Sequence, residues 1–301
     1  MLRAGEEYFA YGTDGPEQHV VLRETGREIP VLRSPDLENW EFLGGAIEPS
    51  ENLRGLDFWA PEVISWKNRF LMYYSAGEPE GEGHKLRVAA SNLPQGPFQD
   101  LECILFPDLP FTIDAHPFED PRTGDLYLFF CMDFFDEPVG TGIAGALLDA
   151  DGTAPASTPV PLLRGGADWQ IYERNRFWYG QTWAKWHTVE GPFVVYRQDR
   201  YWMFFSGGLW KGEGYGIGCA VADSPLGPYV ATGIEKGPSV LRTGQFGLRG
   251  PGHCSVVVDP DGEDYLAFHA WDKRYERRQL HVLKLTWTEI GPVICDPHVP
   301  D

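Results

Sequence analysis

The sequence predicts an all-β protein, a five-bladed β-propeller of four-stranded blades. Three observations lead to this fold class. Five similar segments recur along the chain; glycine and proline are frequent, with 35 and 25 residues; and no segment shows a sustained helical period bounded by helix caps. Frequent turn residues suit many short strands, and four-stranded sheets repeated around an axis form a propeller.

Each recurring segment is a polar turn followed by a run of aromatic and aliphatic residues. The five segments are GEEYFAYGT (5–13), KNRFLMYYS (67–75), TGDLYLFFC (123–131), QDRYWMFFS (198–206) and GEDYLAFHA (262–270). In the last four a short apolar run precedes the turn, which predicts a β-hairpin. Only Met1, Leu2 and Arg3 precede the first turn closely, so the first blade is predicted to be incomplete at the N-terminus.

Further strands complete the blades. The segments VLRSPDLENWEF (31–42), LRVAASNLPQGPF (86–98) and IGCAVADSPLGPYV (217–230) each join a strand to a Ser-containing turn and an aromatic residue. A pair of β-sandwiches is the competing all-β interpretation. Five similar units with long, variable insertions favour the propeller. Residues 148–163 are rich in Pro, Ala and Thr and are interpreted as a connection between the third and fourth units, so residues 1–301 are predicted to be one domain.

Composition limits the partners. The net charge of −19 repels nucleic acid and anionic membranes, whereas an aromatic content of 14% suits a neutral sugar polymer. The five cysteines include no C-x-x-C pair, which argues against a zinc site or a redox motif. The N-terminal segment MLRAGEEYFAYGTDG lacks the features of a signal peptide. We therefore expect a cytoplasmic protein if Met1 is the true start, and secretion stays open if the N-terminus is truncated.

Candidate site residues lie just before the first strand of four blades, where a propeller directs side chains toward its axis. The segments read DFWAPEV (57–63), TIDAHPF (112–118), HTVEGPF (187–193) and GPGHCSV (250–256), and they offer Trp59, Asp114, Glu190 and His253. Alone, each has an ordinary structural interpretation, such as a turn cap for the Asp. Two carboxylates, an aromatic ring and an imidazole in one cavity are typical of a site that cleaves sugars. We expect Glu190 and Asp114 to approach each other across neighbouring blades.

The motifs WAPEV with YYSA, IDAHPFED with YLFF, EGPFVVYRQDRYWMFFSGG with ADSPLGPY, and GPGHCSVVVDPDGEDYLAFHAWD extend over nearly the whole chain. In these motifs the sequence resembles glycoside hydrolase family forty-three, the arabinofuranosidases, xylosidases and arabinanases with a five-bladed propeller. The resemblance implies an inverting hydrolase. It makes Glu190 the general acid and Asp114 the residue that orients this acid and raises its pKa, because a neighbouring negative charge disfavours a second one.

The resemblance also bears on substrate and metal binding. Trp59, His116 and Trp271 are the candidate residues that stack on the sugar and hydrogen-bond to it. Several members of the family hold a calcium or other ion on the propeller axis through the His of the GPGH motif and water molecules, so His253 is the candidate metal ligand. No organic cofactor is expected.

The general base of the family is absent from the chain as given. It is an Asp just before the first strand of the first blade, usually followed by Pro, and that position falls before Met1. Three explanations stay open: the numbering starts at an internal Met, the base is truly lost, or Asp57 or Glu62 replaces it. Truncation or loss is favoured, because a base has to be placed within a fraction of an ångström.

The resulting hypothesis is hydrolysis of α-L-arabinofuranosyl or β-D-xylosyl groups from oligosaccharides of plant arabinan or xylan, and the sequence does not separate the two sugars. A catalytically inactive, carbohydrate-binding propeller is the alternative. A propeller phosphorylase is a third hypothesis, and it needs a basic phosphate ligand, for which Arg249 is the candidate.

Overall fold

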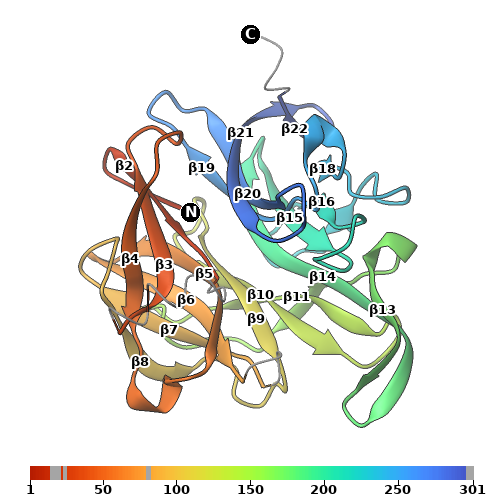
Figure 1. The fold of residues 1–301 in the computed structure, drawn as a ribbon, viewed down its shortest axis with the longest axis horizontal. Coiled ribbons are helices and arrows are strands. Elements are labelled where there is room, and N and C mark those ends of the chain that lie inside the picture. The colour runs from red at the N-terminus through yellow and green to blue at the C-terminus, as the bar shows by residue number, and fades with distance from the viewer. Residues whose placement is uncertain (14–21, 23–25, 79–82, 296–301) are drawn as a thin grey trace. The chain divides into compact units, whose positions relative to one another are not determined.

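The computed structural model describes the chain except residues 14–21, 23–25, 79–82 and 296–301. Its regular elements are β-strands and a few 3-10 helices of three residues each (Figure 1). Among the residues that the structure describes, no helix is long and apolar enough to span a membrane. The predicted all-β class is therefore confirmed.

The chain divides into two compact units. Unit 1 comprises Met1–Met132 and Ala146–Pro159, and unit 2 comprises Asp133–Gly145 and Val160–Asp301. Each unit is described by itself below. The prediction that residues 1–301 form one domain stays a prediction.

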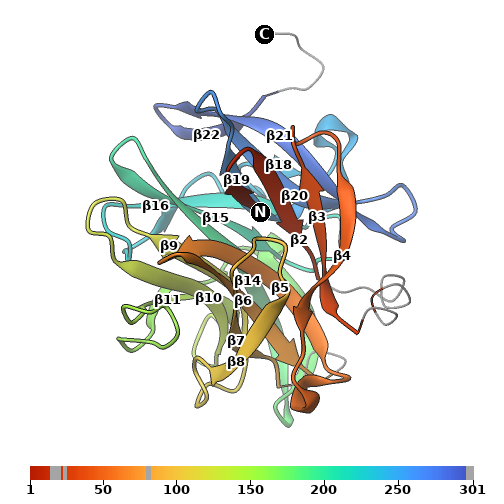
Figure 2. The same cartoon turned by 90° about the vertical axis from the view of Figure 1, so that its left-hand side faces the viewer.

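Unit 1 is built mainly from two antiparallel meanders of four strands (Figure 2). They run in the order β1-β2-β3-β4 and β8-β7-β6-β5, and a short parallel pairing of Ile47 with Phe98 joins β4 to β8. Strands β9 and most of β10 form a further hairpin. The elements of this part are β1 (Leu2–Ala4), β2 (Glu7–Tyr11), β3 (Glu28–Ser34), β4 (Glu41–Glu48), η1 (Glu51–Leu53), β5 (Asp57–Trp66), β6 (Arg69–Gly77), β7 (Lys85–Ser91), β8 (Phe98–Ile104), β9 (Thr112–Glu119) and β10 (Leu126–Phe134).

Unit 2 contains one complete four-stranded meander, in the order β19-β20-β21-β22, and a larger sheet around β14 and β15. Strand β14 pairs with β13 along its first part and with β15 along its second. The elements are β11 (Gly140–Leu147, which begins in this unit), β12 (Val160–Leu163), η3 (Asp168–Gln170), β13 (Ile171–Trp178), β14 (Gln181–Arg197), β15 (Arg200–Gly207), β16 (Gly216–Ala222), β17 (Val230–Ala231), β18 (Leu241–Arg242), η4 (Gln245–Gly247), β19 (Gly252–Val258), β20 (Asp264–Trp271), β21 (Arg278–Thr288) and β22 (Gly291–Ile294).

The four predicted hairpins are present as the pairs β5–β6, β9–β10, β14–β15 and β19–β20. Their alternating apolar residues fill the cores of the two units. In unit 1, Phe58 and Tyr74 from the paired strands β5 and β6 stack at 5.7 Å between ring centroids. The segment 148–163 differs in part from its interpretation as a connection, because Val160–Leu163 form β12, which pairs with β11.

Candidate active site

The first strand of each hairpin carries a β-bulge near its start. Strand pairing is interrupted after Trp59 in β5, after Ile113 in β9, after Glu190 in β14 and after Gly252 in β19. In all four strands the residue that follows has a positive φ angle: 45° at Ala60, 57° at Asp114, 58° at Gly191 and 48° at His253. A bulge re-aims the side chains beside it. The predicted site residues therefore lie where the backbone departs from the regular strand.

Hydroxyl groups support these bulges. The backbone N–H of Asp114 donates to Ser75 Oγ at 3.3 Å, and the N–H of His253 donates to Ser206 Oγ at 2.8 Å. The N–H of Ala60 donates to Thr13 Oγ1 at 3.0 Å in the same way. A positive φ is costly for a residue with a side chain, so a specific partner for its N–H helps to hold the backbone there.

In unit 2, Glu190 is held by a tyrosine that the sequence analysis did not single out. The hydroxyl of Tyr215 donates to Glu190 Oε1 at 2.6 Å. The ring of Tyr215 is 1% exposed and stacks on His269, with 5.9 Å between centroids and 11° between planes. A β-carbon on Gly252 would lie 2.0 Å from the Tyr215 ring, so this ring fits only against a glycine. The Oε1 oxygen of Glu190 therefore accepts a hydrogen bond from a hydroxyl whose position is fixed by packing.

Tyr172 of unit 2 lies within electrostatic reach of Glu190. Burial raises the pKa of the Tyr172 hydroxyl, the positive charge of Arg176 opposes this rise, and the negative charge of Glu190 adds to it. Arg176 lies 4.9 Å from the centre of the Tyr172 ring. His253 lies beside the residue after Glu190, because a β-carbon on Gly191 would be 3.1 Å from His253 Cγ. His253 therefore packs against Gly191, the neighbour of Glu190 in the chain.

Burial also determines the charge of the histidine beneath Tyr215. It lowers the pKa of His269 well below the ordinary value, and electrostatic interaction with Arg278, His253 and His281 lowers it further. His269 is therefore a neutral imidazole at pH 7. It supports the ring of Tyr215 without adding a positive charge there.

In unit 1, the predicted residues also lie close to the bulges. Asp114 is 6% exposed, and Cys131 Sγ lies 3.9 Å from its Oδ2. Trp59 stacks on His84 at 3.7 Å between ring centroids. His116 is buried and stacks on Phe129. The predicted approach of Asp114 to Glu190 joins the two units and stays a prediction.

Trp271, a predicted sugar-binding residue, is largely buried in unit 2. It is 9% exposed, its ring stacks on Trp210 at 5.4 Å, and its Nε1 donates to the Trp210 carbonyl at 3.0 Å. Trp210 therefore covers one face of Trp271 and is itself only half-buried. The role of Trp271 in binding sugar stays a prediction.

The described residues do not by themselves form a metal cage. Among them, no group of three or more His, Cys, Asp or Glu side chains is placed to hold an ion. Calcium prefers six to eight oxygen ligands, and His253 offers one nitrogen. An ion there would take its shell from water and backbone, so His253 as a metal ligand stays a prediction, and no step below uses an ion.

Glu62 is one of the two acids considered as a replacement base. Its Oε1 lies 3.3 Å from the amino group of Met1, and its side chain is 13% exposed. It is in β5, where it pairs with Tyr73 just after the bulge. Its role as a base stays a prediction.

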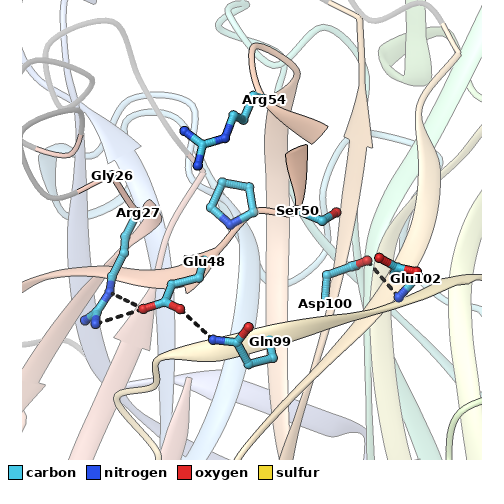
Figure 3. Close-up of a pocket in the computed structure, with 9 residues that line it drawn as sticks. Gly26, Arg27, Glu48, Ser50, Arg54, Gln99, Asp100 and Glu102 are labelled. Carbon is cyan, nitrogen blue, oxygen red and sulfur yellow. Dashed lines mark hydrogen bonds and ion pairs between the residues drawn. The ribbon is translucent and has the colours of Figure 1, made fainter. Parts of the chain in front are cut away.

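A pocket of about 720 Å³ in unit 1 is separate from these residues (Figure 3). Its polar groups bind one another: Arg27 and Gln99 both donate to Glu48, and the N–H of Glu102 donates to Asp100. None of the predicted site residues lines it, and no aromatic ring does. The lining residues are Gly26, Arg27, Glu48, Pro49, Ser50, Arg54, Gln99, Asp100 and Glu102. A sugar would find no stacking surface there.

Known proteins resemble this chain over most of its length. A probable arabinan endo-1,5-alpha-L-arabinosidase D of Emericella nidulans is 27% identical over 84% of the chain and 70% of that protein. An extracellular exo-alpha-(1->5)-L-arabinofuranosidase of Cellvibrio japonicus is 27% identical over 90% of the chain and 81% of that protein. The crystal structure of a thermostable family-43 glycoside hydrolase superposes with a TM-score of 0.82 at 30% identity, covering 100% of this chain and 93% of the other.

The family itself is identified by a match that spans almost the entire sequence. Residues 1–292 fit the model of glycosyl hydrolases family 43. This confirms the resemblance found in the sequence motifs, and it agrees with the nature of the relatives and of the similar structure. The chain belongs to glycosyl hydrolases family 43 and is a glycosidase.

Proposed function

We propose that this glycosidase inverts the anomeric centre and releases α-L-arabinofuranosyl or β-D-xylosyl groups from oligosaccharides of plant arabinan or xylan. The proposal includes the five-bladed propeller of four-stranded blades as the scaffold. The observation that carries it is the placement of Glu190 at the bulge of β14, with its Oε1 bound by the Tyr215 hydroxyl. The arabinan and arabinofuranoside activities in the names of the relatives support the substrate class.

Glu190 acts as the general acid in this proposal. A carboxyl group that protonates a leaving oxygen has to hold its proton on the oxygen that faces the glycosidic bond. Because Tyr215 donates to Oε1, the proton of Glu190 lies on Oε2. Tyr215 thereby sets which oxygen of the acid reacts, and Asp114 is proposed to orient the acid and to raise its pKa. The base that activates water in an inverting reaction is not assigned.

Hydrolysis of two aryl glycosides tests this function. We expect the purified protein to cleave aryl α-L-arabinofuranoside or aryl β-D-xyloside. The aryl glycoside that is cleaved faster identifies the sugar that the protein releases. Proton NMR of the first product should show the anomer opposite to that of the substrate. Oligosaccharide binding without any cleavage would favour the inactive, carbohydrate-binding alternative.

Replacing Tyr215 with Phe should weaken the acid without unfolding the protein. The ring and its stack on His269 stay, but the donor to Glu190 Oε1 is lost. We expect kcat to fall by about 10- to 100-fold, the effect of losing about 1.5–3 kcal/mol from one hydrogen bond to a charged group. A hydrogen bond to a carboxylate favours its charged form, so its loss raises the pKa of Glu190. The basic limb of the pH–rate profile should then move to higher pH, because activity requires the protonated acid.

The pH profile distinguishes positioning from packing. A merely structural tyrosine would leave the basic limb in place and would change only the thermal midpoint of unfolding. An unchanged profile together with an unchanged kcat in Tyr215→Phe would contradict the role proposed for this hydroxyl.

A further inference from the structure

Unit 2 carries a basic patch, although the chain as a whole has a net charge of −19. The turn between β20 and β21 is its centre, since four of the seven residues from 272 to 278 are Lys or Arg. Two more cations lie in the loops that follow β15 and η4. The patch consists of Lys211, Arg249, Lys273, Arg274, Arg277 and Arg278, of which all but the half-buried Arg249 are exposed.

The basic patch surrounds a stacked pair of tryptophans. Trp210 and Trp271 stack with 22° between their planes. Lys211 Nζ lies 4.6 Å from the centre of the Trp210 ring, and Arg278 Cζ lies 5.0 Å from the same centre. The carbonyl of Arg249 accepts the N–H of Trp271 at 2.8 Å. Lys211 and Arg278 thus lie against the aromatic pair.

Acidic residues near the patch do not cancel it. Glu213, Asp272 and Glu276 are the acids of the two turns. The carboxylate of Asp272 accepts the backbone N–H groups of Arg274 and Glu276, both at 3.0 Å, and these contacts lower its pKa. Asp272 therefore serves to fix the turn. Asp272 keeps its negative charge, so the six cations exceed the three acids by three, and the surface attracts anions.

A chain of contacts connects the patch with the proposed general acid. Lys211 and Arg278 lie over the ring of Trp210, which stacks on Trp271. Trp271 and His269 are two residues apart in β20 and so lie on the same face of that strand, and His269 stacks on Tyr215. Because Tyr215 binds Glu190, successive contacts lead from the basic patch to the acid.

We propose that the basic patch binds the carboxylate of a uronic acid unit in the sugar chain that Glu190 protonates. Guanidinium groups bind carboxylates through paired hydrogen bonds, and aromatic rings beside them suit a sugar ring. A neutral oligosaccharide has no group that matches six cations. The inference rests on the proposed function and narrows its substrates to plant oligosaccharides that carry an acidic sugar close to the bond that is cleaved.

Ligand binding to a variant that cleaves oligosaccharides only very slowly tests the inference. Calorimetry on Glu190→Gln compares a xylo-oligosaccharide bearing one glucuronic acid with the same oligosaccharide lacking it, and with an oligogalacturonate. We expect about tenfold tighter binding of a uronate ligand at low salt, since exposed ion pairs contribute up to about 1 kcal/mol each. The advantage should shrink as salt screens the charges. The uronate ligand that binds more tightly, the glucuronic acid-bearing xylo-oligosaccharide or the oligogalacturonate, identifies the type of sugar that supplies the carboxylate.

Substitutions locate the site. Arg278→Gln combined with Lys211→Gln should remove most of the preference, and Lys211→Arg should retain it. Lys67→Gln is the matched control, because Lys67 is an exposed lysine of unit 1 paired with Asp151. Equal affinity for the acidic and neutral ligands, or a preference that survives the double substitution, would overturn the inference. The proposed function fails separately, if the wild-type protein cleaves no neutral aryl glycoside.

Discussion

Replacing Glu190 with glutamine is expected to slow the cleavage of natural oligosaccharides by about 10²- to 10⁴-fold, the range of general acid catalysis. An amide cannot give a proton to the leaving oxygen. The Tyr215 hydroxyl that binds Oε1 can bind the amide oxygen equally well, so the fold around the site should persist. Aryl glycosides with very acidic leaving groups need little protonation, and they should keep much of their rate.

The decisive measurement compares the rate of oligosaccharide cleavage with the rate of cleavage of a dinitrophenyl glycoside. In Glu190→Gln the first rate should fall much more than the second, relative to the wild-type protein. In a control variant both rates should change by the same factor. Glu173→Gln is that control, because Glu173 is a half-exposed glutamate of β13 with an ion pair to Arg176. Undiminished cleavage of the oligosaccharide by Glu190→Gln would remove Glu190 from the role of acid.

Replacing Asp100 with alanine is expected to cost about 3–5 kcal/mol of the free energy of unfolding, the usual effect of stripping one partner from a buried ion pair. Asp100 binds Arg87 through both oxygens, at 2.7 Å and 3.1 Å, and also accepts the hydroxyl of Tyr74. The side chains of Arg87 and Asp100 are only 7% and 1% exposed. The substitution leaves a buried guanidinium without its counter-charge.

Chemical denaturation followed by tryptophan fluorescence measures this loss. Glu41→Ala is the comparison, because Glu41 pairs with Arg33 at 2.6 Å but at 62% and 40% exposure, and an exposed pair contributes about 1 kcal/mol or less. Replacing both partners, as in Arg87→Met with Asp100→Leu, should recover most of the stability. If Asp100→Ala and Glu41→Ala lost the same free energy of unfolding, the claim that the buried ion pair is costlier to break than the exposed one would be wrong.

The predictable part of the fold depends on local patterns. A polar turn between apolar runs specifies a hairpin by itself, which is why the pairs β5–β6, β9–β10, β14–β15 and β19–β20 could be predicted from the sequence. The hairpin of β13 with the first part of β14 was missed. Its residues 171–187 mix Arg, Lys and Glu with Trp and Tyr, and a strand exposed over much of its length has no clean alternation.

Of the candidate site, the residues at strand starts could be predicted and their supports could not. Glu190 and Asp114 follow from motif and position. Tyr215 lies 25 residues beyond Glu190, just before β16, and it reaches the acid only through the pairing of β14, β15 and β16. Such a contact depends on strand register and on the open space above Gly252. Neither feature can be predicted from a local sequence pattern.

The hydroxyls that bind the bulges have an implication for how this chain can be altered. Thr13 binds Ala60, Ser75 binds Asp114, and Ser206 binds His253. Each hydroxyl lies within two residues of the end of the second strand of one repeat, and each bulge lies in the first strand of a later repeat. The backbone that presents a functional side chain is thus governed by its upstream neighbour. Repeats of this protein are therefore not independent modules, and a graft or recombination that exchanges one should carry the preceding second strand with it.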